Sequence, residues 1–329
     1  MADEVRIWTD KKLSKMENRL TSIYQKSAKG IYKTWDNFMA KAAEETSDLQ
    51  KAYEDAKKSG DKSLIKKTGK KLSTYKKEVT LQNEQYQEML EGVTGRIATV
   101  NQTALAYINN QLPSIYGANY NGIKTDADNL GFKFNLVNES TVKRLVLDGD
   151  IQLPYKKLDV IKDKRWNTKQ LNSAVLQGIL QGESMDKIAE RIKPIVNNNE
   201  NAAIRNARTM VTGAENRGRL DSYKALEDEG AVLSKVWIAT ADGRTREWHL
   251  SMDGQEVDVN DVFIDGNGNE LEYPGDPDGA PESVYNCRCS MATHITGIKQ
   301  ADGSIKNIDY ESESTLHDEQ IEKEKKKRI

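Results

Sequence analysis

The chain has 329 residues, of which 37% are hydrophobic and 30% are charged, so it can bury a core while much of its surface stays solvated. Its 49 basic and 51 acidic residues nearly cancel, which excludes a global positive field that attracts nucleic acid or an anionic membrane; any DNA contact must come from a local patch. No apolar run predicts a membrane span or a signal peptide. The two cysteines are too close together to form a disulfide that joins distant segments, so we expect a protein of a reducing cytoplasm.

The first third of the chain has the spacing of long amphipathic helices. Apolar residues recur at steps of three and four over residues 13–42 and again over residues 65–107. The second pattern stops before Pro113, and the break at residues 59–61 is short, which makes the two helices antiparallel neighbours. Residues 1–112 are therefore expected to form a coiled-coil-like helical hairpin. A bundle of three or four helices is the alternative if an arm breaks at Gly30, Gly69 or Gly92.

Residues 113–167 are rich in Gly, Asn and Asp, and we expect them to form a connector with one short helical piece near residues 139–147. Two stretches with helical apolar spacing, residues 167–196 and 199–230, should follow this connector. In the first stretch a helix is predicted to be capped by Thr168, and a loop at residues 182–184 starts the next helix. Pro194 and the Asn run after it separate this unit from the last helix, which ends at Gly230.

Beyond Leu233 the apolar spacing changes towards two, and residues 262–273 read as a strand, a Gly/Asn turn and a second strand. The predicted fold class is therefore α+β, with the long helical region followed by a module (168–298) in which helices precede a small antiparallel sheet, and then by a charged tail (299–329). A calcium loop is disfavoured against a plain β-turn, because Glu270 stands where such a loop needs glycine. The oxygen-bearing side chains that partly imitate such a loop are Asp265, Asn267, Asn269 and Asp276.

Both cysteines of the chain and two of its three histidines lie in this module. Thiolates and imidazoles are the ligands that zinc favours, and a structural zinc site made of His249, Cys287, Cys289 and His294 would lock a small sheet. Because only one residue separates the cysteines, two buried cysteines with hydrogen-bonded histidines remain an open alternative. A cysteine nucleophile beside Arg288, or a metal-dependent hydrolase that uses the same cluster, is a further alternative.

A row of arginines stands on the last predicted helix. The steps between Arg208, Glu215 and Arg219 suit a solvated face with intrahelical pairing, although such a row could also face an anion. The candidate nucleic-acid contacts are Arg217, Arg219, Lys325, Lys326, Lys327 and Arg328.

Four segments of the module, “GILQGESMDKIAERI”, “ARTMVTGAENRGRLDSY”, “WIATADGRTREWHLSMDGQ” and “LEYPGDPDGAPESVYNCRC”, follow one another within residues 171–293. In this order they resemble the Mu F-like family of phage head morphogenesis (minor capsid) proteins. His294 is not among the family's recurring positions, and Met210 stands where relatives often have an acidic residue. The resemblance maps those positions onto Arg208, Thr209, Asp242, Arg244, Thr245, Arg246, His249, Asp253, Gly254, Pro274, Gly275, Asn286, Cys287, Arg288 and Cys289.

The resemblance implies a noncatalytic minor head protein of a tailed phage, associated with the portal and acting in head assembly, with DNA packaging or ejection as a further role. It implies the portal protein, the scaffold or major capsid protein and the packaged DNA as partners, no membrane, and a place inside the head or, during assembly, in the host cytoplasm. Some relatives carry a toxin domain after the module; about 35 residues follow Thr293, which we expect to be too few for one. An enzyme that uses the His/Cys cluster and a DNA-binding accessory protein are the alternatives.

Overall fold

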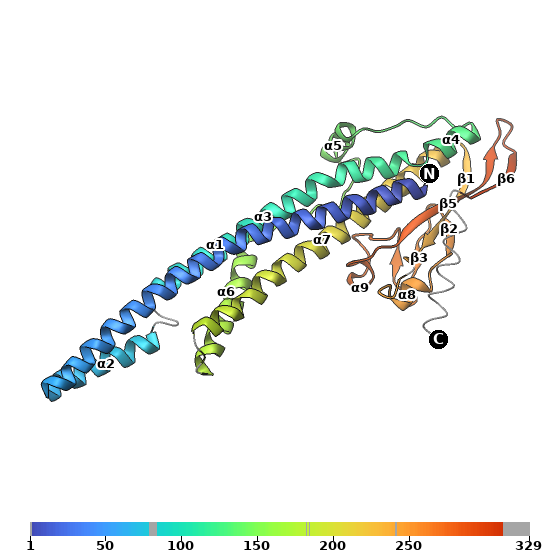
Figure 1. The fold of residues 1–329 in the computed structure, drawn as a ribbon. Coiled ribbons are helices and arrows are strands. Elements are labelled where there is room, and N and C mark those ends of the chain that lie inside the picture. The colour runs from blue at the N-terminus through green and yellow to red at the C-terminus, as the bar shows by residue number, and fades with distance from the viewer. Residues whose placement is uncertain (1, 79–83, 182, 184, 241, 312–329) are drawn as a thin grey trace. The chain divides into compact units, whose positions relative to one another are not determined.

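The structure is a computed structural model that describes residues 2–78, 84–181, 183, 185–240 and 242–311 (Figure 1). The chain divides into two compact units, each made of separate stretches of sequence. Unit 1 comprises Met1–Asn18, Ala106–Lys156 and Ile204–Ile329, and unit 2 comprises Arg19–Leu105 and Lys157–Ala203.

Long helices precede a small antiparallel sheet, so the predicted α+β class is confirmed. None of the described helices is long and apolar enough to cross a membrane. The long helices are α1 (Ala2–Ser59), α2 (Lys62–Glu78), α3 (Glu84–Asn121), α6 (Val160–Leu180) and α7 (Met185–Asp228), and the short ones are α4 (Lys124–Leu130), α5 (Glu139–Asp148), α8 (Glu247–Leu250) and α9 (Pro281–Val284).

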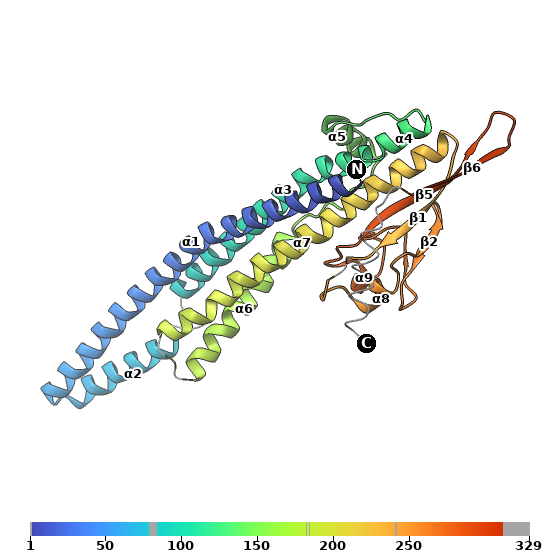
Figure 2. The same cartoon turned by 45° about the vertical axis from the view of Figure 1, so that its right-hand side comes forward.

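In unit 2, the chain turns back at the predicted break, but the second predicted arm, residues 65–107, is divided between α2, which ends at Glu78, and α3, which begins at Glu84. α1 ends at Ser59, and Gly60 has a φ of 73°, a left-handed conformation that glycine adopts without strain. α2 then runs back along α1 (Figure 2), and a Cβ atom built on Gly69 would lie 3.0 Å from the ring of Tyr53. The glycine thus allows close packing of the two helices and does not break an arm.

The core of unit 2 is made by four helices, because each turns one apolar stripe towards the others. The buried side chains that form it include Ile31, Trp35 and Phe38 of α1, Met89, Val93 and Ile97 of α3, Leu171 and Val175 of α6, and Ile188, Ile192 and Ile195 of α7.

A polar layer crosses this bundle and takes at least one side chain from each of the four helices. The Tyr24 hydroxyl donates to Asn101 Oδ1 at 2.6 Å, and Asn101 Nδ2 donates to Asp163 Oδ1 at 2.9 Å and to Asn199 Oδ1 at 2.8 Å. Asn199 Nδ2 in turn donates to Asn167 Oδ1 at 2.9 Å. Such a layer fixes the register of the helices, because a shift along any one of them leaves buried polar groups without partners.

Two prolines that were predicted to end or separate helices lie inside them. α3 continues through Pro113, and α7 continues through Pro194. A proline inside a helix removes one backbone hydrogen bond. Here the residues beside it, Leu112 and Ile115 in α3 and Ile195 in α7, are buried, and this apolar packing keeps the helices intact.

The helix that was predicted to start at Thr168 starts earlier. α6 begins at Val160, because the Asp159 side chain caps it by accepting a hydrogen bond of 3.0 Å from the Lys162 backbone N–H. The short helical piece predicted near residues 139–147 is confirmed as α5, whose N-cap Asn138 accepts from the Thr141 backbone.

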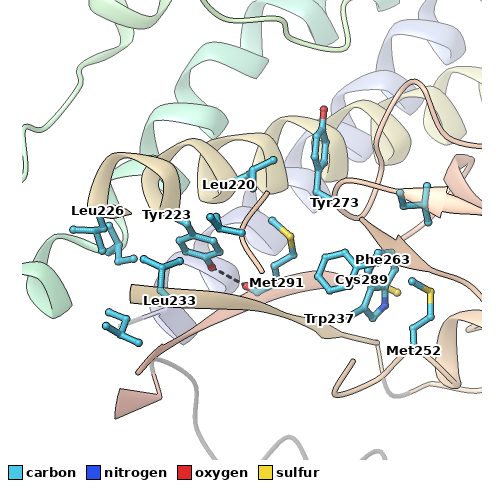
Figure 3. Close-up of a cluster of buried hydrophobic side chains, with 14 of the residues drawn as sticks. Leu220, Tyr223, Leu226, Leu233, Trp237, Met252, Phe263, Tyr273, Cys289 and Met291 are labelled. Atoms are coloured by element: carbon cyan, nitrogen blue, oxygen red, sulfur yellow. Dashed lines mark hydrogen bonds between the residues drawn. The ribbon is translucent and has the colours of Figure 1, made fainter. Parts of the chain in front are cut away.

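In unit 1, a four-stranded antiparallel sheet has the order β2 (Glu256–Asp258), β1 (Ala231–Ile238), β5 (Ser290–Lys299) and β6 (Ile305–Glu311). In its register Leu233 lies opposite Ile295 and Trp237 lies opposite Met291. One face of the sheet packs against α7, as Figure 3 shows for Leu220, Tyr223 and Leu226 above Leu233 and Met291.

The strand, turn and strand predicted over residues 262–273 are confirmed as β3 (Phe263–Ile264) paired with β4 (Glu270–Leu271). Asp265 makes the turn between them: its Oδ1 accepts from the backbone of Asn267 at 2.8 Å and of Asn269 at 2.9 Å. These bonds are those of an Asx turn, which accounts for the Asp and Asn residues without a calcium ion.

Candidate metal centre

The sheet register brings the histidine and the two cysteines together. Ile238 at the end of β1 lies opposite Ser290 at the start of β5. The chain that leaves β1 therefore turns into α8, which carries His249, beside the chain that enters β5, which carries Cys287 and Cys289.

The three side chains form one compact, dry group. His249 is 1% exposed and each cysteine is 2% exposed. The Nδ1 atom of His249 lies 3.6 Å from the Sγ atom of Cys287 and 3.6 Å from that of Cys289, and each residue offers a donor atom within 4.8 Å of the others. Neither cysteine forms a disulfide.

These distances suit a shared metal ion. With zinc bonds of about 2.3 Å to sulfur and about 2.05 Å to nitrogen, a tetrahedral angle separates the two donor atoms by about 3.6 Å. The same distance fits a weak hydrogen bond between a thiol and an imidazole nitrogen. The group could therefore hold an ion, and it supplies three protein ligands.

The surroundings of the group are largely apolar. The ring of Trp237 stands edge-on to His249 with 5.6 Å between centroids, and Trp248 does so at 6.4 Å. Among the described residues no hydrogen-bond partner reaches His249 Nε2. The hydrogen bond between the two thiols lowers the pKa of Cys289 and raises that of Cys287, so Cys289 is the first to become the thiolate that binds metals.

α7 holds the segment that carries the cysteines through a row of four polar side chains, of which sequence reasoning missed Thr212 and Asn216. Thr209 Oγ1 accepts from the Asn286 backbone at 2.9 Å, and Thr212 Oγ1 donates to the Cys287 carbonyl at 2.8 Å. Asn216 Nδ2 donates to the carbonyls of Pro274 and Cys289, each at 3.1 Å, and Arg219 Nη1 donates to the Met291 carbonyl at 2.9 Å. The steps of three, four and three between these positions place them on one helix face, which is the signal that could have found them.

The backbone geometry explains two positions of the family motif, Gly275 and Asn286. A Cβ atom built on Gly213 of α7 would lie 2.8 Å from the Gly275 carbonyl oxygen, so neither glycine accepts a side chain here. Gly275 also has a φ of 82°. Asn286 has a φ of 59°, which is uncommon outside glycine and turns the chain just before Cys287.

Other motif residues tie the loop after β1 to the cysteine segment. Asp242 Oδ1 accepts from Arg288 Nη2 at 2.7 Å and from the Arg244 backbone at 2.9 Å, and these bonds hold the pKa of the Asp242 carboxyl well below its usual range. Thr245 Oγ1 lies 3.3 Å from the same oxygen, and the Arg246 guanidinium donates to the Tyr285 carbonyl.

The remaining motif residues also have structural contacts. Asp253 Oδ1 accepts from the Ala239 backbone at 2.8 Å, and Gly254, with a φ of 76°, donates its N–H to the Trp237 carbonyl. Arg208 Nε lies 2.6 Å from Glu17 Oε1. Met210 is fully buried, so it serves packing.

Some sequence-predicted site residues lie elsewhere. His294 lies on β5 with its Nδ1 atom 2.9 Å from Glu256 Oε1, and the cluster of three possible ligands does not include it. The interpretation of Arg219 and Glu215 as part of a solvated face is wrong, because both are buried; Arg217 pairs with Asp221 at 3.0 Å. The other predicted nucleic-acid contacts, Lys325, Lys326, Lys327 and Arg328, lie outside the described residues.

Comparison with known proteins identifies the module. The chain is 27% identical over 174 residues to an NAD(+)--arginine ADP-ribosyltransferase EFV of Enterococcus faecalis, covering 52% of this chain and 35% of that protein. It is 28% identical over 144 residues to the minor head protein GP7 of Bacillus phage SPP1, covering 42% of this chain and 46% of that protein. The chain thus spans less than half the length of these relatives, and no solved structure matches it. Residues 169–292 match the family described as Phage Mu protein F like protein, so this part of the chain is similar to that family.

Proposed function

We propose that this protein is a minor head protein of a tailed bacteriophage, associated with the portal and acting in head assembly and in DNA packaging or ejection. The observation that carries the proposal is the match of residues 169–292 to the Mu F-like family, and the likeness to the SPP1 minor head protein supports it. We assign the module to residues 168–298 and the binding of the portal and of the scaffold or major capsid protein to the helical residues 1–112. The protein then acts in the host cytoplasm during assembly and inside the head afterwards.

The proposed role is noncatalytic. The two relatives are named for different functions, a transferase and a head protein, yet each is similar to this chain over 144 residues or more. Similarity to this chain therefore does not by itself transfer transferase activity. The His249, Cys287 and Cys289 group, which an enzyme alternative would use, is buried to an extent that keeps a substrate away from it.

The composition of purified heads tests this role. In a phage that encodes this chain, we expect mass spectrometry to find it in procapsids and virions in few copies, and crosslinking to join it to the portal protein. Heads that lack the chain at both stages would overturn the head assignment. Heads that contain it crosslinked only to the major capsid protein would overturn the portal association alone.

We further propose that the cluster of three ligands binds one zinc ion with a structural role. The support is the pair of 3.6 Å distances from His249 Nδ1 to the two sulfur atoms, together with the dry surroundings of the group. An ion held there would join α8, which follows β1, to the segment that leads into β5.

Metal analysis of the purified, freshly reduced protein tests this site. We expect one zinc per chain in the wild type and none in Cys287→Ser with Cys289→Ser, because thiolates are the main ligands. His294→Ala is the matched control: it removes a histidine of the same sheet that is not in the cluster, and it should keep one zinc. No zinc in the wild type, or equal zinc in the double variant, would overturn the site.

Cobalt substitution separates a structural from a catalytic ion. A catalytic site keeps an exchangeable position, whereas a structural site is closed. Three protein ligands leave a fourth position on the ion, but the group is buried, so we expect azide and cyanide not to reach that position and the absorption spectrum of the cobalt-loaded protein to stay unchanged. A spectrum that shifts with the added anion would favour the hydrolase alternative.

A further inference from the structure

Helix α2 has an unusually one-sided charge. Its sequence, KSLIKKTGKKLSTYKKE, contains seven lysines and a single glutamate, within a chain whose basic and acidic residues nearly balance. No acidic residue stands in its first turn. A helix that only needs a solvated surface usually alternates both signs, because neighbouring like charges repel.

The lysines gather on one half of the helix. At about 100° per residue, lysines repeated at steps of four fall within one half of the helix surface, opposite the positions of Ile65 and Leu72. Leu72 is buried and Ile65 half-buried, which identifies that side as the packed one. The described lysines of the opposite half, all exposed, are Lys66, Lys67, Lys70 and Lys71, here called the α2 lysine face.

These charges are not neutralised within the described part of the chain. No carboxylate of a described side chain forms an ion pair with any lysine of the α2 lysine face. The lysines at the end of α1 differ: Lys57 pairs with Glu54 at 3.3 Å, and Lys58 pairs with Asp55 at 3.6 Å. The α2 lysine face therefore concentrates positive charge over a length of about 8 Å, at 1.5 Å per residue.

Duplex nucleic acid is the partner that this chemistry fits best. A duplex carries one phosphate charge per about 1.7 Å of its axis, so several phosphates lie within reach of the α2 lysine face. Protein interfaces are depleted in lysine and favour Arg, Tyr and Trp, and α2 contains no Arg or Trp. Lysine is a flexible point charge without the planar fork that reads a base edge.

We infer that the α2 lysine face binds the phosphate backbone of duplex DNA without reading its sequence. This surface differs from the arginines and the tail that the sequence pattern indicated, and it uses only exposed side chains of unit 2. The inference goes beyond the proposed head role and does not depend on it, because DNA binding can be measured with the purified full chain.

The salt dependence of DNA affinity tests the inference. Fluorescence anisotropy with a duplex of about 30 base pairs should show binding that weakens steeply with NaCl. In Lys66→Gln with Lys67→Gln and Lys70→Gln, the slope of log K against log salt should become shallower by about 2.7, since each phosphate contact contributes about 0.9. Between about 50 and 200 mM salt, the affinity of this variant should then fall about 40-fold less than that of the wild type.

A matched control removes equal charge elsewhere. Lys57→Gln with Lys58→Gln and Lys162→Gln changes three exposed lysines that each pair with a carboxylate, and it should keep the wild-type slope. Circular dichroism should show that both triple variants keep their helix content, since Gln and Lys have similar helix propensities. Equal slopes in the two triple variants, or no binding at low salt, would overturn the inference. Tighter binding to polyglutamate than to duplex would overturn DNA as the partner in favour of an acidic protein. A failure here leaves the head assignment untouched, because that assignment is read from the composition of heads.

Discussion

Gly218→Ala is predicted to destabilise unit 1, although alanine favours a helix more than glycine does. Gly218 lies in α7 where this helix crosses α3, and an added Cβ atom would lie 2.5 Å from the Tyr116 carbonyl oxygen and 3.1 Å from the Tyr120 backbone nitrogen. Better helix propensity contributes about 1 kcal/mol. Overpacking costs about 1–3 kcal/mol, and here the cost lies at the top of that range because backbone atoms cannot rotate away. The expected net loss is about 2 kcal/mol.

Gly117→Ala is the matched control for this prediction. Gly117 lies in α3 of the same unit, and its added Cβ atom would lie 3.5 Å from Val142 Cγ2, an ordinary contact. This variant should gain up to about 1 kcal/mol. Urea denaturation followed by far-ultraviolet circular dichroism measures both variants, and the midpoint should fall for Gly218→Ala and rise for Gly117→Ala. Equal midpoints in the two variants would refute the reasoning from the helix crossing.

Three further predictions concern charged groups. Burial raises the pKa of Asp163, so the ionised carboxylate destabilises the folded state increasingly as pH rises above 3.8, and it still does so at neutral pH. Asp163→Asn can still accept the hydrogen bond from Asn101, so it should raise the melting temperature at pH 7 but not below pH 3.8. The Arg288 hydrogen bond lowers the pKa of Asp242, so Asp242→Asn should lower the free energy of unfolding by about 1 kcal/mol at neutral pH. In a series of urea midpoints, the difference between this variant and the wild type should vanish as the pH falls below 3.8. Burial lowers the pKa of Lys235 to about 8, so between pH 8 and 10.5 the unfolded chain holds a proton that the folded chain does not, and the wild type should gain stability as pH rises. A pH series of melting temperatures for Lys235→Met should lack that rise.

Periodicity predicted the helices of this chain well where one apolar stripe was enough to define them. The break after Ser59 and the run of α5 were both found from local signals. The breaks expected at Pro113 and Pro194 were wrong. The sequence shows that each proline removes a backbone hydrogen bond from a helix, but it does not show that the residues beside the proline are buried, and this burial stabilises the helix. That contribution is visible only in the tertiary structure.

The candidate site shows the same limit. His249 and the cysteines come together through the pairing of β1 with β5, which spacing in the sequence suggested but could not fix. His294 is five residues beyond Cys289 along an extended strand, a distance of about 16 Å, so it lies too far along β5 to belong to the cluster of possible ligands. Asn216 was missed because its partners are backbone carbonyls, and these leave no trace in the side-chain pattern.

The segment from Asn286 to Met291 is held on two sides, and this would let three protein ligands serve the proposed structural ion. On one side, four side chains of α7 bond to the backbone of the segment. On the other, the thiols of Cys287 and Cys289 face His249 of α8. Structural zinc sites usually take four protein ligands, because the ion must order the whole fold. Here α7 already orders the segment through these hydrogen bonds, so the proposed ion would need only to join the segment to the α8 turn.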